Sequence, residues 1–151
     1  MRRALTVAFT VVLPLGGCSN ASHSETAVLT ITTGNGLVRT GTLQIAITES
    51  ERERGLAGRS RIPADCGMVF LLDEPNDGPF WMRGVVMTLS IAFWDGDGRI
   101  VAIMDMQPCR REPCELYLPG RSYVGAVEMR QGWFDRHDVE VGDVVHLEDR
   151  G

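Results

Sequence analysis

The cysteines are the residues of this chain whose spacing bears most directly on chemistry. Cys109 and Cys114 enclose four residues, which fits neither the C-x-x-C redox motif nor a complete zinc site, since zinc needs two or more further ligands. Because an export segment precedes the domain, we predict a structural disulfide between them. Cys66 is then the odd thiol, expected to be a small buried residue. A nucleophilic role for Cys66 would require His137 or His146 as a partner.

Methionine is frequent in the centre of the chain. Thioethers can bind Cu(I) in an oxidising compartment, and they also fill irregular cores, which is their commoner use. We predict core packing and no cofactor, with an envelope Cu(I)-binding protein as the alternative. The methionines concerned are Met68, Met82, Met87, Met104 and Met106.

A pair of carboxylates would be needed by a small hydrolase or carbohydrate-active enzyme, a further alternative. The candidates near the centre of the chain are Glu49, Glu53, Asp73 and Glu74. The sequence has no nucleophile-elbow signature and no glycine-rich phosphate loop before a helix. We therefore assign no catalytic residue and predict a non-catalytic binding or structural module.

The first 17 residues have the features of a lipoprotein signal peptide. Two arginines precede an apolar run over residues 4–15 that is too short to span a bilayer. The run ends in Leu-Gly-Gly-Cys18, which resembles the lipobox of bacterial lipoproteins, whose cysteine is acylated and becomes the mature N-terminus. An ordinary secretory signal is the alternative. We expect lipidated Cys18 and residues 18–27 to tether an exported protein to the cell membrane or outer membrane, facing the extracytoplasmic side.

The charge balance argues against nucleic acid as a partner. The 151-residue chain carries a net charge of −5, and all of its basic residues are arginine. Without the two arginines of the signal segment, 13 basic residues stand against 20 acidic ones. An acidic domain lacks the cations that neutralise phosphates. The expected partners are the membrane, through the anchor, and an envelope protein or small ligand.

Residues 28–148 are predicted to form a single all-β domain. Short alternating segments at intervals of about ten residues favour a mainly antiparallel, jelly-roll-like sandwich or barrel with one or two short helices. The central prediction is a hairpin over residues 89–106, whose turn is Asp95-Gly96-Asp97-Gly98. Ser50 and Glu53 are predicted to cap a short helix that stops near Gly58.

Several motifs over residues 28–147 occur together in one order. They read Glu53-Arg54-Gly55-Leu56 with Arg59, Gly67-Met68-Val69-Phe70, Phe80-Trp81-Met82-Arg83, Leu89-x-Ile91-Ala92-Phe93, Asp97-x-Arg99-Ile100-Val101 and Pro108-Cys109-x4-Cys114. With these motifs the chain resembles the domain-of-unknown-function family number 192. The resemblance implies a compact, mostly antiparallel β fold and no particular activity.

The chain departs from the pattern of that family at several positions. Family members usually carry Met-Lys-Asn-Thr and then Pro-Leu-Asp, and here Gly84, Val85 and Ser90 replace the Asn, Thr and Asp. Ala57 stands where a methionine usually follows Gly-Leu. These replacements either remove a polar site or reshape a loop.

The aromatic segment before the hairpin supplies a candidate binding surface, formed by Trp81, Met82, Arg83 and Arg59. Trp81 and Trp94 are expected in the core, because aromatic side chains favour burial. An exposed aromatic patch for a partner is the alternative.

Overall fold

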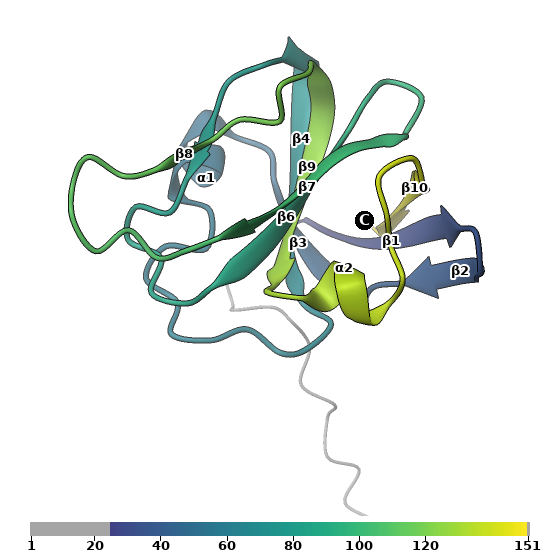
Figure 1. The fold of residues 1–151 in the computed structure, drawn as a ribbon, viewed down its shortest axis with the longest axis horizontal. Helices are drawn as coiled ribbons and strands as arrows, with labels where there is room; N and C mark the ends of the chain where they lie inside the picture. Colours follow the sequence, from purple (N-terminus) through teal and green to yellow (C-terminus); the bar gives the residue numbers. More distant parts are fainter. Residues whose placement is uncertain (1–24, 151) are drawn as a thin grey trace, which may run out of the picture.

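A computed structural model describes residues 25–150, so the predicted signal peptide and Cys18 lie outside the described residues. The described chain is mostly β, with two short helices (Figure 1). The strands are β1 (Thr26–Thr33), β2 (Gly36–Arg39), β3 (Leu43–Ala46), β4 (Gly67–Asn76), β5 (Phe80–Trp81), β6 (Leu89–Trp94), β7 (Ile100–Met106), β8 (Leu116–Tyr117), β9 (Tyr123–Arg130) and β10 (Val144–Arg150). The helices are α1 (Glu49–Arg54) and α2 (Trp133–Arg136).

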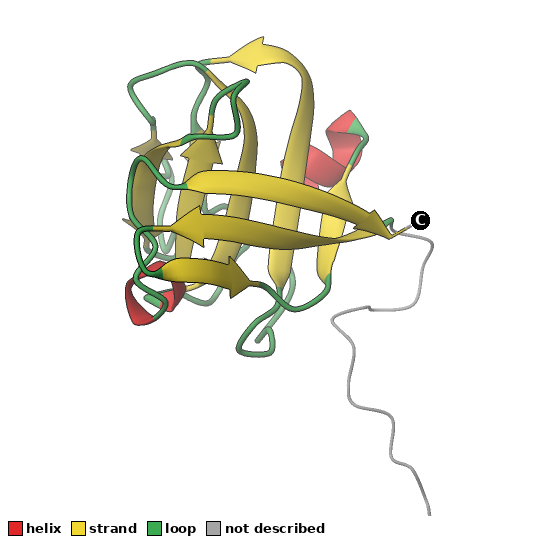
Figure 2. Cartoon of the chain, turned by 90° about the vertical axis from the view of Figure 1, so that its right-hand side faces the viewer, coloured by secondary structure: helices red, strands yellow, loops and turns green. Residues whose placement is uncertain are grey.

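The main sheet is curled into a half-barrel, with the strand order β10-β1-β3-β4-β9-β6-β7 and β2 beside β1. In Figure 2, the strand that ends at the C-terminus, β10, and the strands beside it, β1 and β2, run across the rest of the sheet. The predicted all-β fold is confirmed, and most strand pairs are antiparallel. The exception is β3–β4, a parallel pair joined through α1, whereas the sequence predicts no parallel strands.

The predicted central hairpin is β6–β7, with Leu89 opposite Met106. In its turn the Asp95 carboxylate accepts hydrogen bonds from the backbone N–H groups of Asp97 and Arg99, at 3.1 and 3.0 Å. Gly98 has φ +78°, a conformation that glycine adopts without steric cost. Local turn chemistry therefore fixes the register of the hairpin.

Helix α1 begins two residues earlier than predicted. Its N-cap is Thr48, whose hydroxyl accepts from the Glu51 N–H, while the Glu51 carboxylate accepts from the Thr48 N–H. The predicted box of Ser50 and Glu53 is wrong because the same four-residue pattern occurs twice, offset by two residues. Gly55, with φ +48°, ends the helix in place of the predicted Gly58.

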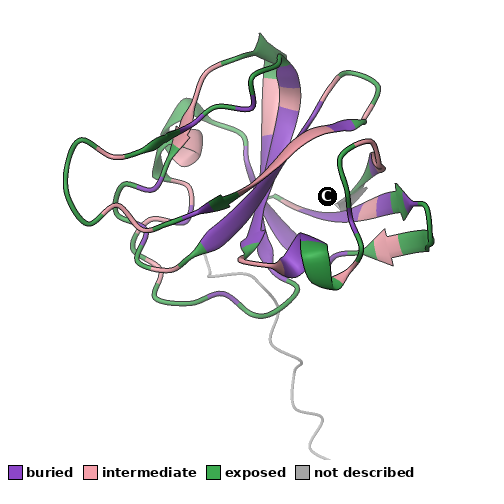
Figure 3. Cartoon of the chain, in the orientation of Figure 1, coloured by how far each residue is buried: buried purple, intermediate pink, exposed green. Residues whose placement is uncertain are grey.

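Two apolar clusters occupy opposite faces of the sheet. Along β4, Phe70 belongs to one cluster and Val69 to the other, as the alternation of side chains in a strand requires. Buried residues concentrate along the central strands (Figure 3). The first cluster contains the edge-to-face pair Phe93 and Tyr123, and the second contains Trp133 and Phe134. No helix within residues 25–150 is long and apolar enough to span a membrane.

Candidate ligand-binding pocket

A pocket of about 160 Å³ opens between α1, β4, β9 and the segment that contains β5. Phe80, Trp81 and Tyr123 form an aromatic wall, and α1 forms a charged wall. In Figure 1, α1 and β8, the partner of β5, lie on the same side of the sheet. The remaining lining residues are Glu49, Arg52, Glu53, Arg54, Gly55, Leu56, Phe70, Leu72, Asn76, Pro79, Arg83, Val85 and Glu128. This volume is below the roughly 300–1,000 Å³ of drug-sized sites and suits a small ligand or one side chain.

Glu128 is the buried polar group of this pocket. It projects from the middle of β9, where Met68 of β4 and Ile91 of β6 are its strand neighbours. The residue is only 4% exposed, and its Oε2 has no hydrogen-bond partner. Burial raises the pKa of this carboxyl to about 8, because removal from water disfavours the charged form. The group is therefore mostly protonated at neutral pH.

Gly55 places the end of α1 against Glu128. A Cβ at this position would lie 3.5 Å from Cζ of Phe70 and 3.8 Å from Oε2 of Glu128. Its positive φ also disfavours residues with a side chain. Glycine thus closes the helix while leaving the carboxyl uncovered by a side chain.

The arginines around the pocket are engaged with protein groups. Arg83 forms an ion pair with Glu112, with Nε and Oε1 2.7 Å apart. This pair raises the pKa of Arg83 and lowers that of Glu112, mainly through the hydrogen bond. Arg52 donates to carbonyls of the neighbouring backbone, and Arg54 donates to the Ser50 hydroxyl at 3.4 Å. Within residues 25–150, neither Glu49 nor Glu53 forms an ion pair.

The predicted binding surface is divided in the structure. Trp81, 38% exposed, and Arg83 line the pocket. Met82 is only 1% exposed, so it belongs to the first apolar cluster and not to a surface. Arg59 is half-buried and donates to the Gln44 amide oxygen. The expectation that Trp81 is core is therefore wrong, because its β5 strand pairs only with short β8 outside the main sheet.

The predicted carboxylates also separate. Glu49 and Glu53 line the pocket, whereas Asp73 and Glu74 are exposed on β4 and do not. The carboxyl at the base of the pocket, Glu128, was missed. Its signal in the sequence is a single acid within an apolar strand pattern.

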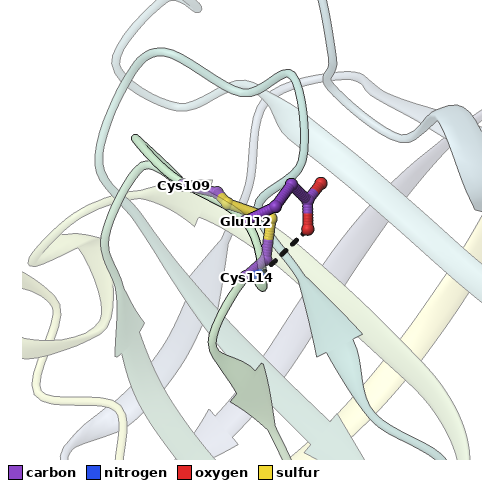
Figure 4. A group of neighbouring side chains, drawn as sticks. All are labelled: Cys109, Glu112 and Cys114. Atoms are coloured by element: carbon purple, nitrogen blue, oxygen red, sulfur yellow. Dashed lines mark hydrogen bonds between the residues drawn. A yellow bond between two sulfur atoms is a disulfide. The ribbon is translucent and has the colours of Figure 1, made fainter.

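Cys109 and Cys114 are joined by the predicted disulfide (Figure 4). The Glu112 carboxylate lies beside them and accepts a hydrogen bond from the Cys114 N–H at 3.1 Å. The sulfur atoms and the carboxylate of these three residues lie close enough together for a metal site, within 4.8 Å of one another. Since the sulfurs are bonded to each other, they offer no thiolate, so the group does not form a zinc site.

Cys66 differs from its prediction. It is buried, as expected, but it is not a free thiol. The neighbouring Asp65 carboxylate instead accepts from the Trp133 indole at 3.0 Å. His137 stacks on that indole, so these residues support α2.

The central methionines pack in or against the first apolar cluster. Met68, Met82 and Met106 are buried members, and Met87 and Met104 are half-buried against them. Packing accounts for all five positions. Anaerobic Cu(I) titration would test the copper alternative.

The replaced family positions have separate surroundings. Gly84 has φ +73°, a conformation that glycine and asparagine both adopt, and a Cβ there would lie 3.2 Å from Cβ of Ala57. Val85 lines the pocket and makes that wall apolar. Ser90 accepts from the Gly132 N–H and donates to Asp105, away from the pocket lining. Only the replacement at Val85 therefore alters the pocket directly.

Comparisons with known proteins agree with this fold. A crystal structure from Sinorhizobium meliloti 1021, described as a "putative transcription regulator", is 23% identical with a TM-score of 0.77, over 85% of this chain and 98% of that chain. A protein of unknown function from Novosphingobium aromaticivorans DSM 12444 is 26% identical with a TM-score of 0.75, over 92% of this chain and 93% of that chain. None of the curated proteins matches. The model of the family DUF192, described as "Uncharacterized ACR", matches residues 29–147. The chain therefore belongs to the DUF192 family.

Proposed function

We propose that this protein is an exported, lipid-anchored module that binds a small ligand in the pocket between α1 and β5. The observation that carries the proposal is Glu128, a buried carboxyl whose Oε2 has no hydrogen-bond partner and which lines a pocket with an aromatic wall. A buried polar group without a hydrogen bond lowers stability, by about 1–3 kcal/mol. A ligand that supplies the missing hydrogen bond to Glu128 would offset this loss of stability, as expected at a binding site.

The pocket proposal is tested by a ligand screen on the purified protein. Two-dimensional NMR would follow a panel of small amines, carboxylates and sugars. We expect at least one class to shift the resonances of Trp81 and Tyr123, and Trp81→Ala to weaken that binding. Leu37→Ala is the matched control, because Leu37 is exposed on β2 and does not line the pocket. A panel that leaves the pocket resonances unmoved would contradict the proposal.

The anchor is tested separately. The supporting features are the Leu-Gly-Gly-Cys18 sequence and the apolar run before it. Cys18→Ser should move the protein from the membrane fraction to the soluble exported fraction. Mass spectrometry of the mature N-terminal peptide should find a lipid thioether on Cys18. An N-terminal peptide without a lipid on Cys18 would contradict lipidation.

A small hydrolase is the second candidate, since Glu128 shares the pocket with Glu49 and Glu53. A carboxyl with a pKa raised by burial has the property of a general acid. Chromogenic glycosides and esters would test this function. Turnover that is lost in Glu128→Gln would support an enzyme, and pocket binding without turnover would support the module.

A further inference from the structure

We infer that the pocket binds the head of a small organic cation that carries N–H donors, a primary ammonium or a guanidinium, with Glu128 as its counter-ion. The inference rests on the proposed function and names the chemical class of its ligand. It goes further than small-ligand binding because it fixes the sign of the ligand's charge and the group that the ligand contacts.

The first argument is the unused capacity of Glu128. Once ionised, the Glu128 carboxylate only accepts hydrogen bonds, and its Oε2 has no partner although it is shielded from water. The complementary ligand group is an N–H donor that carries positive charge, because charge-assisted bonds are about twice as strong as neutral ones. A quaternary ammonium would supply the charge without the hydrogen bond.

The second argument is the balance of charge around the pocket. Arg83 is neutralised by Glu112, and Arg52 and Arg54 are opposed by Glu49 and Glu53 on the same helix. These charges sum to zero. Once ionised, Glu128 therefore gives the site a net negative charge, located at its base.

The third argument excludes an anion at the base. The three arginine side chains already donate to Glu112, to backbone carbonyls and to Ser50. A ligand carboxylate would have to displace these bonds and would lie against a carboxyl group. A cation instead meets the acid at the base and the rings of Phe80, Trp81 and Tyr123 along the wall. Ring faces attract cations by about 0.5–2 kcal/mol.

Binding of a cation should be coupled to release of the Glu128 proton. The other charged or titratable groups that line the pocket are Glu49, Arg52, Glu53 and Arg54 from α1, Arg83 from the segment after β5, and Tyr123 from β9. Burial raises the pKa of Tyr123, and the hydrogen bond with Glu112 raises the pKa of Arg83. Glu128, whose pKa burial raises to about 8, changes its charge between pH 6.5 and 9.

The experiment measures the affinity for methylguanidinium by NMR between pH 6.5 and 9. This probe stays charged throughout, and methylurea is its neutral control of similar shape. With a pKa of about 8 for Glu128, the ionised fraction rises about 30-fold over this range, so the affinity should rise by about the same factor. Methylurea should show no such rise. Glu128→Gln should abolish this rise in affinity. If that variant does not fold, the pH dependence of methylguanidinium binding to the natural protein tests the inference.

Two results would overturn the inference. One is equal, pH-independent binding of methylguanidinium and methylurea at the pocket, which would leave small-ligand binding intact while removing the cation. The other is the absence of any pocket shift with methylguanidinium. If sugars or carboxylates bind there instead, the proposed function stands without this ligand class. If the whole panel fails, both proposals are wrong.

Discussion

Replacement of Glu128 by glutamine should change how the stability of the protein depends on pH. In the unfolded chain this carboxyl titrates near its ordinary value of 4.5, whereas in the native state it holds its proton until about pH 8. Raising the pH through this window therefore ionises the unfolded chain first, and the native state loses stability relative to it. Glu128→Gln removes this loss because an amide does not ionise.

The magnitude follows from the two pKa values. One unit of pKa difference corresponds to about 1.4 kcal/mol. Between pH 4.5 and 7, linkage makes the carboxyl cost the native state about 3 kcal/mol, and the cost levels off at about 5 kcal/mol above pH 8. The variant should thus gain about 3 kcal/mol relative to the natural protein between pH 4.5 and 7.

Urea denaturation followed by tryptophan fluorescence at several pH values provides the measurement. The difference between the two proteins isolates Glu128, because the other titrating groups are common to both. Glu140→Gln, the same substitution at an exposed position, is the matched control. A constant difference between Glu128→Gln and the natural protein from pH 4.5 to 8.5 would refute the reasoning.

Two further predictions concern the fold. Gly125→Ala should destabilise the protein by about 1–3 kcal/mol through overpacking, because a Cβ there would lie 2.2 Å from Cζ2 of Trp94. Gly34→Ala, where the space is open, is its control in thermal unfolding, and equal melting temperatures would contradict the packing argument. Thr48→Ala should cost about 1 kcal/mol through loss of the helix cap, whereas Ser50→Ala should cost little. Urea midpoints measure both changes. A larger loss of stability in Ser50→Ala would indicate that Ser50, and not Thr48, caps the helix.

The sequence predicts the parts of the fold that depend on local chemistry. The β6–β7 hairpin was found because Asp95 and Gly98 have the types that its turn requires. The start of α1 was not found, because two overlapping capping patterns are locally equivalent. The end of strand β3 at Ala46 leaves Thr48 at the helix start. The parallel β3–β4 pair depends on where the chain returns after α1, which periodicity does not encode.

The candidate site was predicted less completely for a related reason. Trp81 and Arg83 belong to a recognisable aromatic segment, and both line the pocket. Glu128 lies about 45 residues away in an apolar strand, and its role depends on burial under α1 and on the lack of a partner. The burial of a side chain and its hydrogen-bond partners depend on the tertiary structure. The sequence therefore indicates a possible binding surface but does not identify Glu128 as the buried carboxyl of the pocket.

The most direct test of the account is the ionisation of Glu128 itself. Carboxyl ¹³C NMR of the natural protein, assigned by comparison with Glu128→Gln, would follow this group between pH 4 and 10. We expect a pKa of about 8, moved to lower values by methylguanidinium. A carboxyl that titrates near 4.5, its ordinary value, with or without the cation would contradict both its burial and its proposed role.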